Sequence, residues 1–173
     1  MAPLVSIIAL AFVAVCVATD VRTRRVPNLV SVSGMLAGMV LNSGYFGAAG
    51  LFSSLAGALV MVALLLGPFA LGGVGGGDVK MMAAVGAFLG PRLALVALGS
   101  GMVLGGAVTA VQLTGRGRLR EKLAATGRML AAAMAARSLA PLRISAGDGR
   151  AVALPYTLPL ALGTAAALVV GGS

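Results

Sequence analysis

The chain has 173 residues, of which 60% are hydrophobic and only 10% are charged. This balance excludes an ordinary water-soluble domain, because too few polar side chains remain to cover its surface. Several membrane-spanning helices are the expected solution, so the sequence predicts an all-α, polytopic membrane protein. The net charge of +9 does not indicate a nucleic-acid partner, because the basic residues lie in the gaps between apolar runs.

The side chains available for chemistry are few. The sequence has no histidine and a single cysteine, Cys16. The usual general base and the commonest metal ligand are therefore missing, and no zinc site built on cysteines can form within the chain. We expect neither a metal nor another cofactor. Acid–base chemistry is left to four acidic residues: Asp20, Asp78, Glu121 and Asp148.

The first apolar run, residues 2–19, is followed by Asp20 and a basic cluster. A cleaved signal peptide carries its basic residues before the apolar stretch, whereas here they come after it. We therefore expect a retained helix with its N-terminus outside and the basic cluster in the cytoplasm. Pro27 then breaks the helix, because proline disfavours helix at the residue before it. The cluster consists of Arg22, Arg24 and Arg25.

Five further apolar runs predict about six transmembrane helices in one domain, 1–173, because no repeat or linker divides the chain. The sequence Asn42-Ser43-Gly44 suits a short external turn after the second run. The polar segment 114–150 carries eight basic residues, so we expect it to be cytoplasmic and partly to lie along the membrane surface. The five runs cover residues 29–41 (or on to 46), 51–71, 79–89, 93–113 and 152–170.

This topology makes a prediction about two of the acids. With the N-terminus outside, the first helix ends inside and the third helix returns there, so Asp20 and Asp78 lie on the same cytoplasmic side. Of the thirteen basic residues, twelve then face the cytoplasm and only Arg92 lies outside. The opposite orientation inverts that ratio and violates the positive-inside rule.

Two carboxylates held close together can perform peptide hydrolysis without a metal. Because they do not readily both ionise, one keeps a proton while the other accepts a proton from the attacking water. The glycines before Asp78 suit such a site, because glycine allows unusual dihedrals and close approach of an extended peptide. Each acid also has an ordinary interpretation. Asp78 suits an N-cap of a helix beginning at Val79, and Asp20 suits a helix end paired with Arg24.

The stretch Asp20-Val21-Arg22-Thr23-Arg24-Arg25-Val26-Pro27-Asn28 fits the pattern D-x-R-x-x-x-x-P-N, and Gly75-Gly76-Gly77-Asp78-Val79-Lys80 fits G-x-G-D-x-K. In this order, the two stretches resemble the signatures of type IV prepilin peptidases. The second signature shares its core with the wider class of GxGD intramembrane aspartyl proteases. The residues that carry the resemblance are Asp20, Arg22, Pro27, Asn28, Gly75, Gly77, Asp78 and Lys80.

The resemblance implies a six-helix protease of the bacterial inner membrane, with Asp20 and Asp78 as its catalytic residues. It implies removal of the basic leader from prepilins or pseudopilins at the cytoplasmic face. Lys80 is then a candidate partner for a glutamate near the start of the substrate's apolar helix. The larger members carry a cysteine-containing insertion associated with methylation, which this sequence lacks. It therefore resembles the short form of tight-adherence (Flp) pilus systems, and the resemblance gives no support for methyltransferase activity.

Two other interpretations remain open at this stage. A non-enzymatic membrane transporter or secretion-assembly component can use boundary aspartates to bind ions or protons. A related protease can instead cut other membrane proteins, as signal-peptide peptidases do. The basic residues also have an alternative to substrate binding: they can set the orientation of the protein in the membrane and bind phospholipid headgroups. The expected partners are the lipid bilayer and a prepilin-like substrate, with no nucleic acid; the sequence leaves the oligomeric state open.

Overall fold

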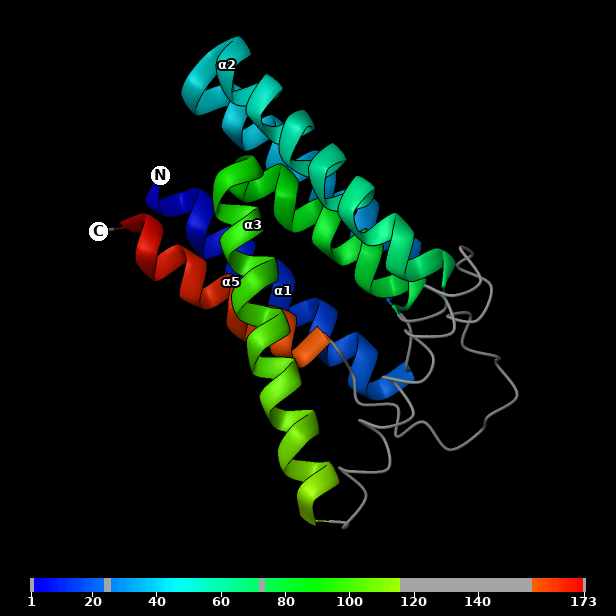
Figure 1. The fold of residues 1–173 in the computed structure, drawn as a ribbon. Helices are drawn as coiled ribbons and strands as arrows, with labels where there is room; N and C mark the ends of the chain where they lie inside the picture. The colour runs from blue at the N-terminus through cyan, green and yellow to red at the C-terminus, as the bar shows by residue number, and fades with distance from the viewer. Residues whose placement is uncertain (1, 24–25, 72–73, 116–156, 173) are drawn as a thin grey trace, which may run out of the picture.

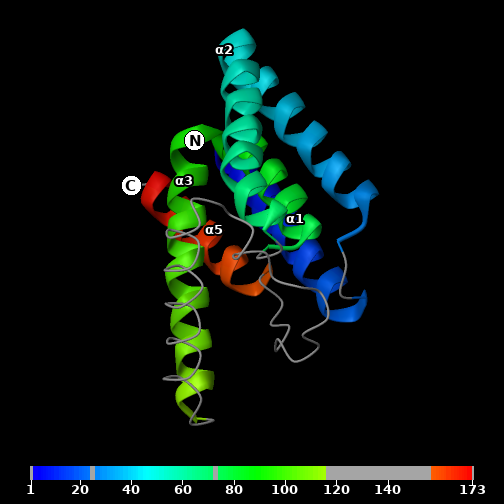
Figure 2. The same cartoon turned by 45° about the vertical axis from the view of Figure 1, so that its right-hand side comes forward.

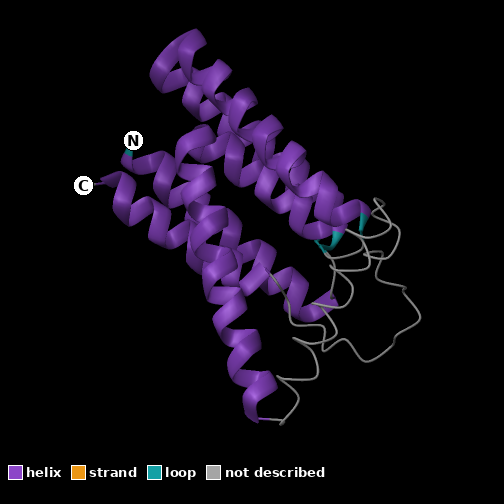
Figure 3. Cartoon of the chain, in the orientation of Figure 1, coloured by secondary structure: helices purple, strands orange, loops and turns teal. Residues whose placement is uncertain are grey.

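The computed structural model describes residues 2–23, 26–71, 74–115 and 157–172, and the regular structure of these residues is helical (Figure 3). Three of the helices, α1, α2 and α3, are long and apolar enough to cross a membrane. The prediction of an all-α protein is therefore confirmed for the described part, whereas most of the basic segment 114–150 lies outside it. The helices are α1 (Pro3–Thr23), α2 (Asn28–Ala70), α3 (Gly76–Gly115) and α5 (Thr157–Gly172).

Helices α2 and α3 each consist of two segments that meet at a glycine. The breaks are at Gly47, with φ 60°, and at Gly90, with φ 72°. Glycine adopts such positive φ angles without the steric cost that other residues meet. Figures 1 and 2 show α2 folding back on itself at one end of the molecule, and Figure 1 shows the reversal of α3. Each reversal lets one long helix contribute two segments to the bundle.

The reversal of α2 corrects the predicted position of its turn. The sequence suggested a loop beginning at Asn42, but residues 42–44 are helical and the chain reverses at Gly47. Asn42 is also buried rather than exposed, with 6% of its surface accessible. Its amide donates to groups on the second segment of α2 and on α3, which explains why a polar residue sits inside this helix.

The first segment of α3 forms the centre of the bundle, with every residue from 81 to 90 buried. Phe12 of α1 packs on Phe88, their ring centroids 5.7 Å apart. Helix α2 approaches through glycines, because a Cβ atom on Gly57 would collide with the backbone of Gly86. Small residues allow this close backbone contact, which is a principal source of helix association in membranes. The helical segment that follows Asp78 is thus packed against both α1 and α2, which fixes its position in the bundle.

The remaining helices bring two distant parts of the chain to the same end. Helix α5 packs along the second segment of α3, where Ser100 donates a hydrogen bond to the carbonyl of Gly163 at 3.1 Å. The two termini lie close together in Figures 1 and 2, so α1 and α5 run in opposite directions. The C-terminal end of α1 and the N-terminal end of α5 consequently meet at the opposite end of this pair.

Candidate active site

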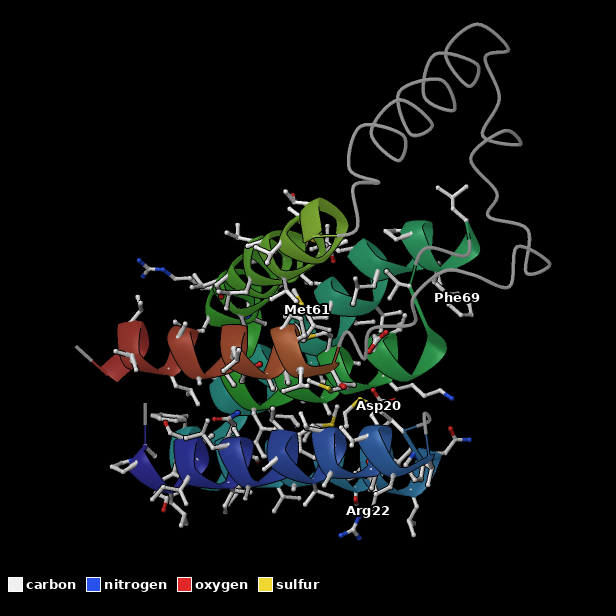
Figure 4. All side chains as sticks on the ribbon, turned by 90° about the horizontal axis from the view of Figure 1, so that it is seen from below. Asp20, Arg22, Met61 and Phe69 are labelled. Atoms are coloured by element: carbon white, nitrogen blue, oxygen red, sulfur yellow. The ribbon has the colours of Figure 1, made fainter. Side chains whose placement is uncertain are left out.

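Asp20 lies in the last turn of α1 and is half-buried. Its side chain projects toward α3 and α5, whereas Arg22 projects from the opposite side of α1 and is exposed (Figure 4). The Asp20 Oδ2 atom accepts a hydrogen bond of 2.7 Å from the hydroxyl of Thr157. The first signature therefore sends its carboxylate into the bundle and its first arginine away from it. Arg24, the alternative partner considered for Asp20, lies outside the described residues.

Asp78 is the third residue of α3, because the helix begins at Gly76 rather than at the expected Val79. It is therefore not the N-cap of that helix. Its backbone N–H donates to the carbonyl of Gly75 at 3.1 Å, and its carboxylate in turn accepts a backbone hydrogen bond from Gly75. A third helical residue that reaches back to the residue before the helix is the acidic partner of a capping box. This local role orients the carboxylate at the start of α3.

The glycines before Asp78 have a different use from the one the sequence suggested. Positive φ angles occur at Gly47 and Gly90, whereas Gly76 and Gly77 belong to the helix. At Gly75, a Cβ atom would lie 3.2 Å from Asp78 Oδ2, which is tighter than ordinary contact. The absence of a side chain at this position thus gives the carboxylate room to fold back toward the backbone.

The two signatures contact each other directly. Lys80 Nζ donates a hydrogen bond of 2.6 Å to Asn28 Oδ1. A Cβ atom on Gly77 would lie within 3.4–3.5 Å of Val26, so the backbones of the two stretches are adjacent there. Pro27, in an extended conformation with φ −61° and ψ 142°, directs the chain into α2 and presents Asn28 as its first residue. The P-N and D-x-K parts of the patterns are therefore joined in space.

The joining of the signatures brings both acids to one end of the bundle. The carboxylate of Asp20 lies within electrostatic range of Asp78, and both side chains are half-buried. Partly desolvated carboxylates within this range repel each other more strongly than they would in water, which favours protonation of one of the two. A pair of this kind can act as general acid and general base on one bound water. Within the described ranges, no group of three or more His, Cys, Asp or Glu side chains is placed to hold a metal ion.

All eight residues singled out from the sequence lie at this end, and seven of them gather around the acids, whereas the side chain of Arg22 points away from Asp20. The sequence reasoning missed Thr157, which the structure places against Asp20. The predicted topology could have indicated Thr157, because the last apolar run begins on the same side of the membrane as both acids. Polar residues near its start were therefore candidates for the site. The seven residues are Asp20, Pro27, Asn28, Gly75, Gly77, Asp78 and Lys80.

Comparison with known protein families gives an independent assignment. The model of the Type IV leader peptidase family matches residues 7–110, which is more than half of the chain. The chain belongs to this family. The matched region contains both acids and the Lys80–Asn28 contact, whereas Thr157 lies beyond it. Comparisons with curated proteins and with solved structures found no match. Family and fold together indicate a membrane-embedded protease of the leader-peptidase type.

Proposed function

We propose that the protein is an intramembrane aspartyl endopeptidase that removes the basic leader from type IV, Flp-like prepilins or pseudopilins. The observation that carries the proposal is that Asp20 and Asp78 lie at one end of the bundle, within electrostatic range of each other, where the two signatures are joined. A carboxylate at a membrane boundary is costly, so a pair of them points to function rather than to packing. Membership of the leader peptidase family supports proteolysis as that function.

The chemistry needs only the two carboxylates, a water molecule and an extended peptide. The ionised carboxylate takes a proton from water as the water oxygen attacks the scissile carbonyl carbon. The protonated carboxylic acid donates a hydrogen bond to the carbonyl oxygen, which stabilises the charge that develops there. As the C–N bond breaks, a proton passes to the departing amine. The two acids titrate as a pair, and no covalent intermediate forms.

Several observations support a site at the cytoplasmic face of the bacterial inner membrane. Exposed Arg22 and Lys80 lie at the same end as the two acids. Arg92 follows the break at Gly90, about 21 Å along the first segment of α3 from its start. This separation fits a topology with the N-terminus outside, six spanning segments and the acids inside. The proposed topology also puts the eight basic residues of segment 114–150 on this side, as the positive-inside rule requires.

The length of the first α3 segment supports a recessed site. Its residues from Gly76 to Leu89 extend about 21 Å, less than the roughly 30 Å of a bilayer's hydrocarbon core. Because residues 81–90 are buried among other helices, this segment has no need to reach both surfaces. Asp78 can therefore lie below the headgroups, while exposed Gly75 leaves the start of the helix open to water and peptide.

The test is cleavage of a prepilin-like peptide, with a basic leader and an apolar helix, by the purified protein in lipid vesicles. Asp20→Asn and Asp78→Asn are each expected to lower kcat by about 10²–10⁴-fold, because each removes one proton-transfer group. Glu121→Gln is the matched control, since Glu121 lies outside both signatures; it should cleave normally. Cleavage is also expected to continue in the presence of a chelator.

The same preparations separate this proposal from a non-enzymatic role. Near-normal cleavage by a correctly folded Asp20→Asn or Asp78→Asn variant removes that residue from the mechanism. Failure of the wild-type protein to cut any leader-bearing peptide, combined with proton or cation uptake that depends on both acids, assigns the pair to transport instead.

A further inference from the structure

Asp20 lies where the local electrostatics are unfavourable for a negative charge. It lies in the last turn of α1, where the helix dipole presents partial negative charge and disfavours a carboxylate. It is also half-buried, so water compensates only part of that cost. A carboxylate in such a place requires a hydrogen-bond donor from elsewhere to satisfy it and to fix its orientation. Helix α5 supplies that donor through Thr157.

Thr157 differs from the other described threonines in what its hydroxyl contacts. Each of the others donates to a backbone carbonyl three or four residues back in its own helix. Thr157, the first described residue of α5, instead donates its hydroxyl to a second helix, at 2.7 Å from Asp20 Oδ2. The five others are Thr19, Thr23, Thr109, Thr114 and Thr164.

We propose that Thr157 is a positioning residue for catalysis: its hydroxyl locks the Asp20 carboxylate so that Oδ1 remains available for the attacking water. This inference rests on the proposed proteolytic function. Thr157 is 1% exposed, so its hydroxyl has little water to exchange with, and its hydrogen bond is strengthened by the dry surroundings. The branched Cβ atom limits the rotation of the hydroxyl about χ1. Oδ2 is thereby occupied, and the rotation of the carboxylate is restricted.

A fixed carboxylate orientation matters because small errors of orientation strongly lower the rate of a proton-transfer step. A reacting group held in its productive geometry avoids much of the entropic cost of finding it, and a shift of 1 Å can lower the rate by about 100-fold. Thr157 does not meet the substrate in this scheme, so its loss affects turnover rather than peptide binding. The final helix of the chain thus completes a site whose two acids come from α1 and α3.

The test compares Thr157→Val, which keeps the shape but loses the donor, with Thr157→Ser, which keeps the donor. The matched control is Thr164→Val, because Thr164 is also fully buried in α5 but donates to Leu160 of its own helix. We expect Thr157→Val to lower kcat by about 10- to 100-fold with KM within about twofold, as loss of a hydrogen bond to a charged group does. Thr157→Ser should recover to within about threefold of wild type, and Thr164→Val should keep its kcat.

Thermal unfolding of each variant separates positioning from folding, and Thr157→Ala replaces Thr157→Val if the valine protein does not fold. Wild-type kcat in a donor-free variant, or equal losses in Thr157→Ser and Thr157→Val, overturns the inference. Asp20→Asn is measured in the same series. If it is inactive while Thr157→Val is fully active, only the positioning role fails. If Asp20→Asn is itself active, the proposed function fails.

Discussion

Replacing Asn42 tests how the bundle tolerates the reversal of α3. Pro91 has no N–H group to offer the carbonyl of Ala87 four residues back, and the break at Gly90 ends the helix there. The amide nitrogen of Asn42 lies 2.9 Å from the carbonyl oxygens of both Ala87 and Phe88. A side chain of α2 therefore supplies donors that α3 itself lacks at its break. In Asn42→Leu these carbonyls lose their donors in a buried site.

The expected loss of stability follows from the number of hydrogens that the Asn42 amide can donate. Asn42 Nδ2 has two hydrogens for three acceptors, the third being Ser54 Oγ at 3.0 Å. Two full hydrogen bonds are thus the most it can make at once. Hydrogen bonds between membrane helices contribute about 0.6 kcal/mol each on average and up to about 1.7. Asn42→Leu, which keeps the number and branching of the side-chain heavy atoms, is therefore expected to lower the free energy of unfolding by about 1–3.5 kcal/mol.

The assay is thermal or denaturant unfolding of the purified protein in one detergent, alongside cleavage of a prepilin-like peptide. The control is Ser54→Ala, which removes one acceptor but leaves both α3 carbonyls with their donor; it should cost less than Asn42→Leu. Asn42 lies about 21 Å along α2 from Asn28, so kcat per folded molecule should not change. Wild-type stability in Asn42→Leu, or equal losses in the two variants, would falsify the capping role.

Three further predictions concern the site, the packing and the topology. Lys80→Ala should weaken cleavage of a substrate with a glutamate near the start of its apolar helix more than cleavage of one without it; equal losses exclude that pairing. Gly57→Ala should destabilise the protein by about 1–3 kcal/mol, because its Cβ collides with Gly86, whereas Gly44→Ala has open space and should not; equal melting temperatures would contradict the packing argument. A cysteine introduced at Ser138 should be labelled only from the cytoplasmic side, and labelling from outside intact cells would refute the topology.

The candidate site was largely readable from the sequence because charged residues are rare in it. With four acids in the chain, two of them at the ends of apolar runs, helix counting was enough to predict that Asp20 and Asp78 share one side. The structure brings them within electrostatic range and joins Lys80 to Asn28. Their catalytic roles remain predictions, which the cleavage assay addresses.

The packing of the helices against one another, in contrast, could not be predicted from the sequence. In a water-soluble helix, polar residues mark the exposed face, but here lipid accepts apolar residues on every face. Nothing in the composition of residues 81–90 distinguishes a central helix from a lipid-facing one, yet all of them are buried. Asn42 was misread for a related reason. A polar residue followed by serine and glycine suggests a turn, whereas its actual partners depend on Pro91, far away in the sequence.

The ends of four helices explain how two acids can be kept in an apolar bundle. The Lys80–Asn28 and Thr157–Asp20 contacts bring the N-terminal ends of α2, α3 and α5 together near the C-terminal end of α1. Helix N-termini carry partial positive charge and unpaired N–H groups, which offset the cost of a nearby carboxylate. Asp78 accepts a backbone hydrogen bond at the start of its own helix, and Asp20 accepts a hydrogen bond from the side chain of Thr157, the first described residue of α5. Acids placed in the middle of these helices would have no such compensation, so the helix ends are the places in this bundle where carboxylates can be stabilised.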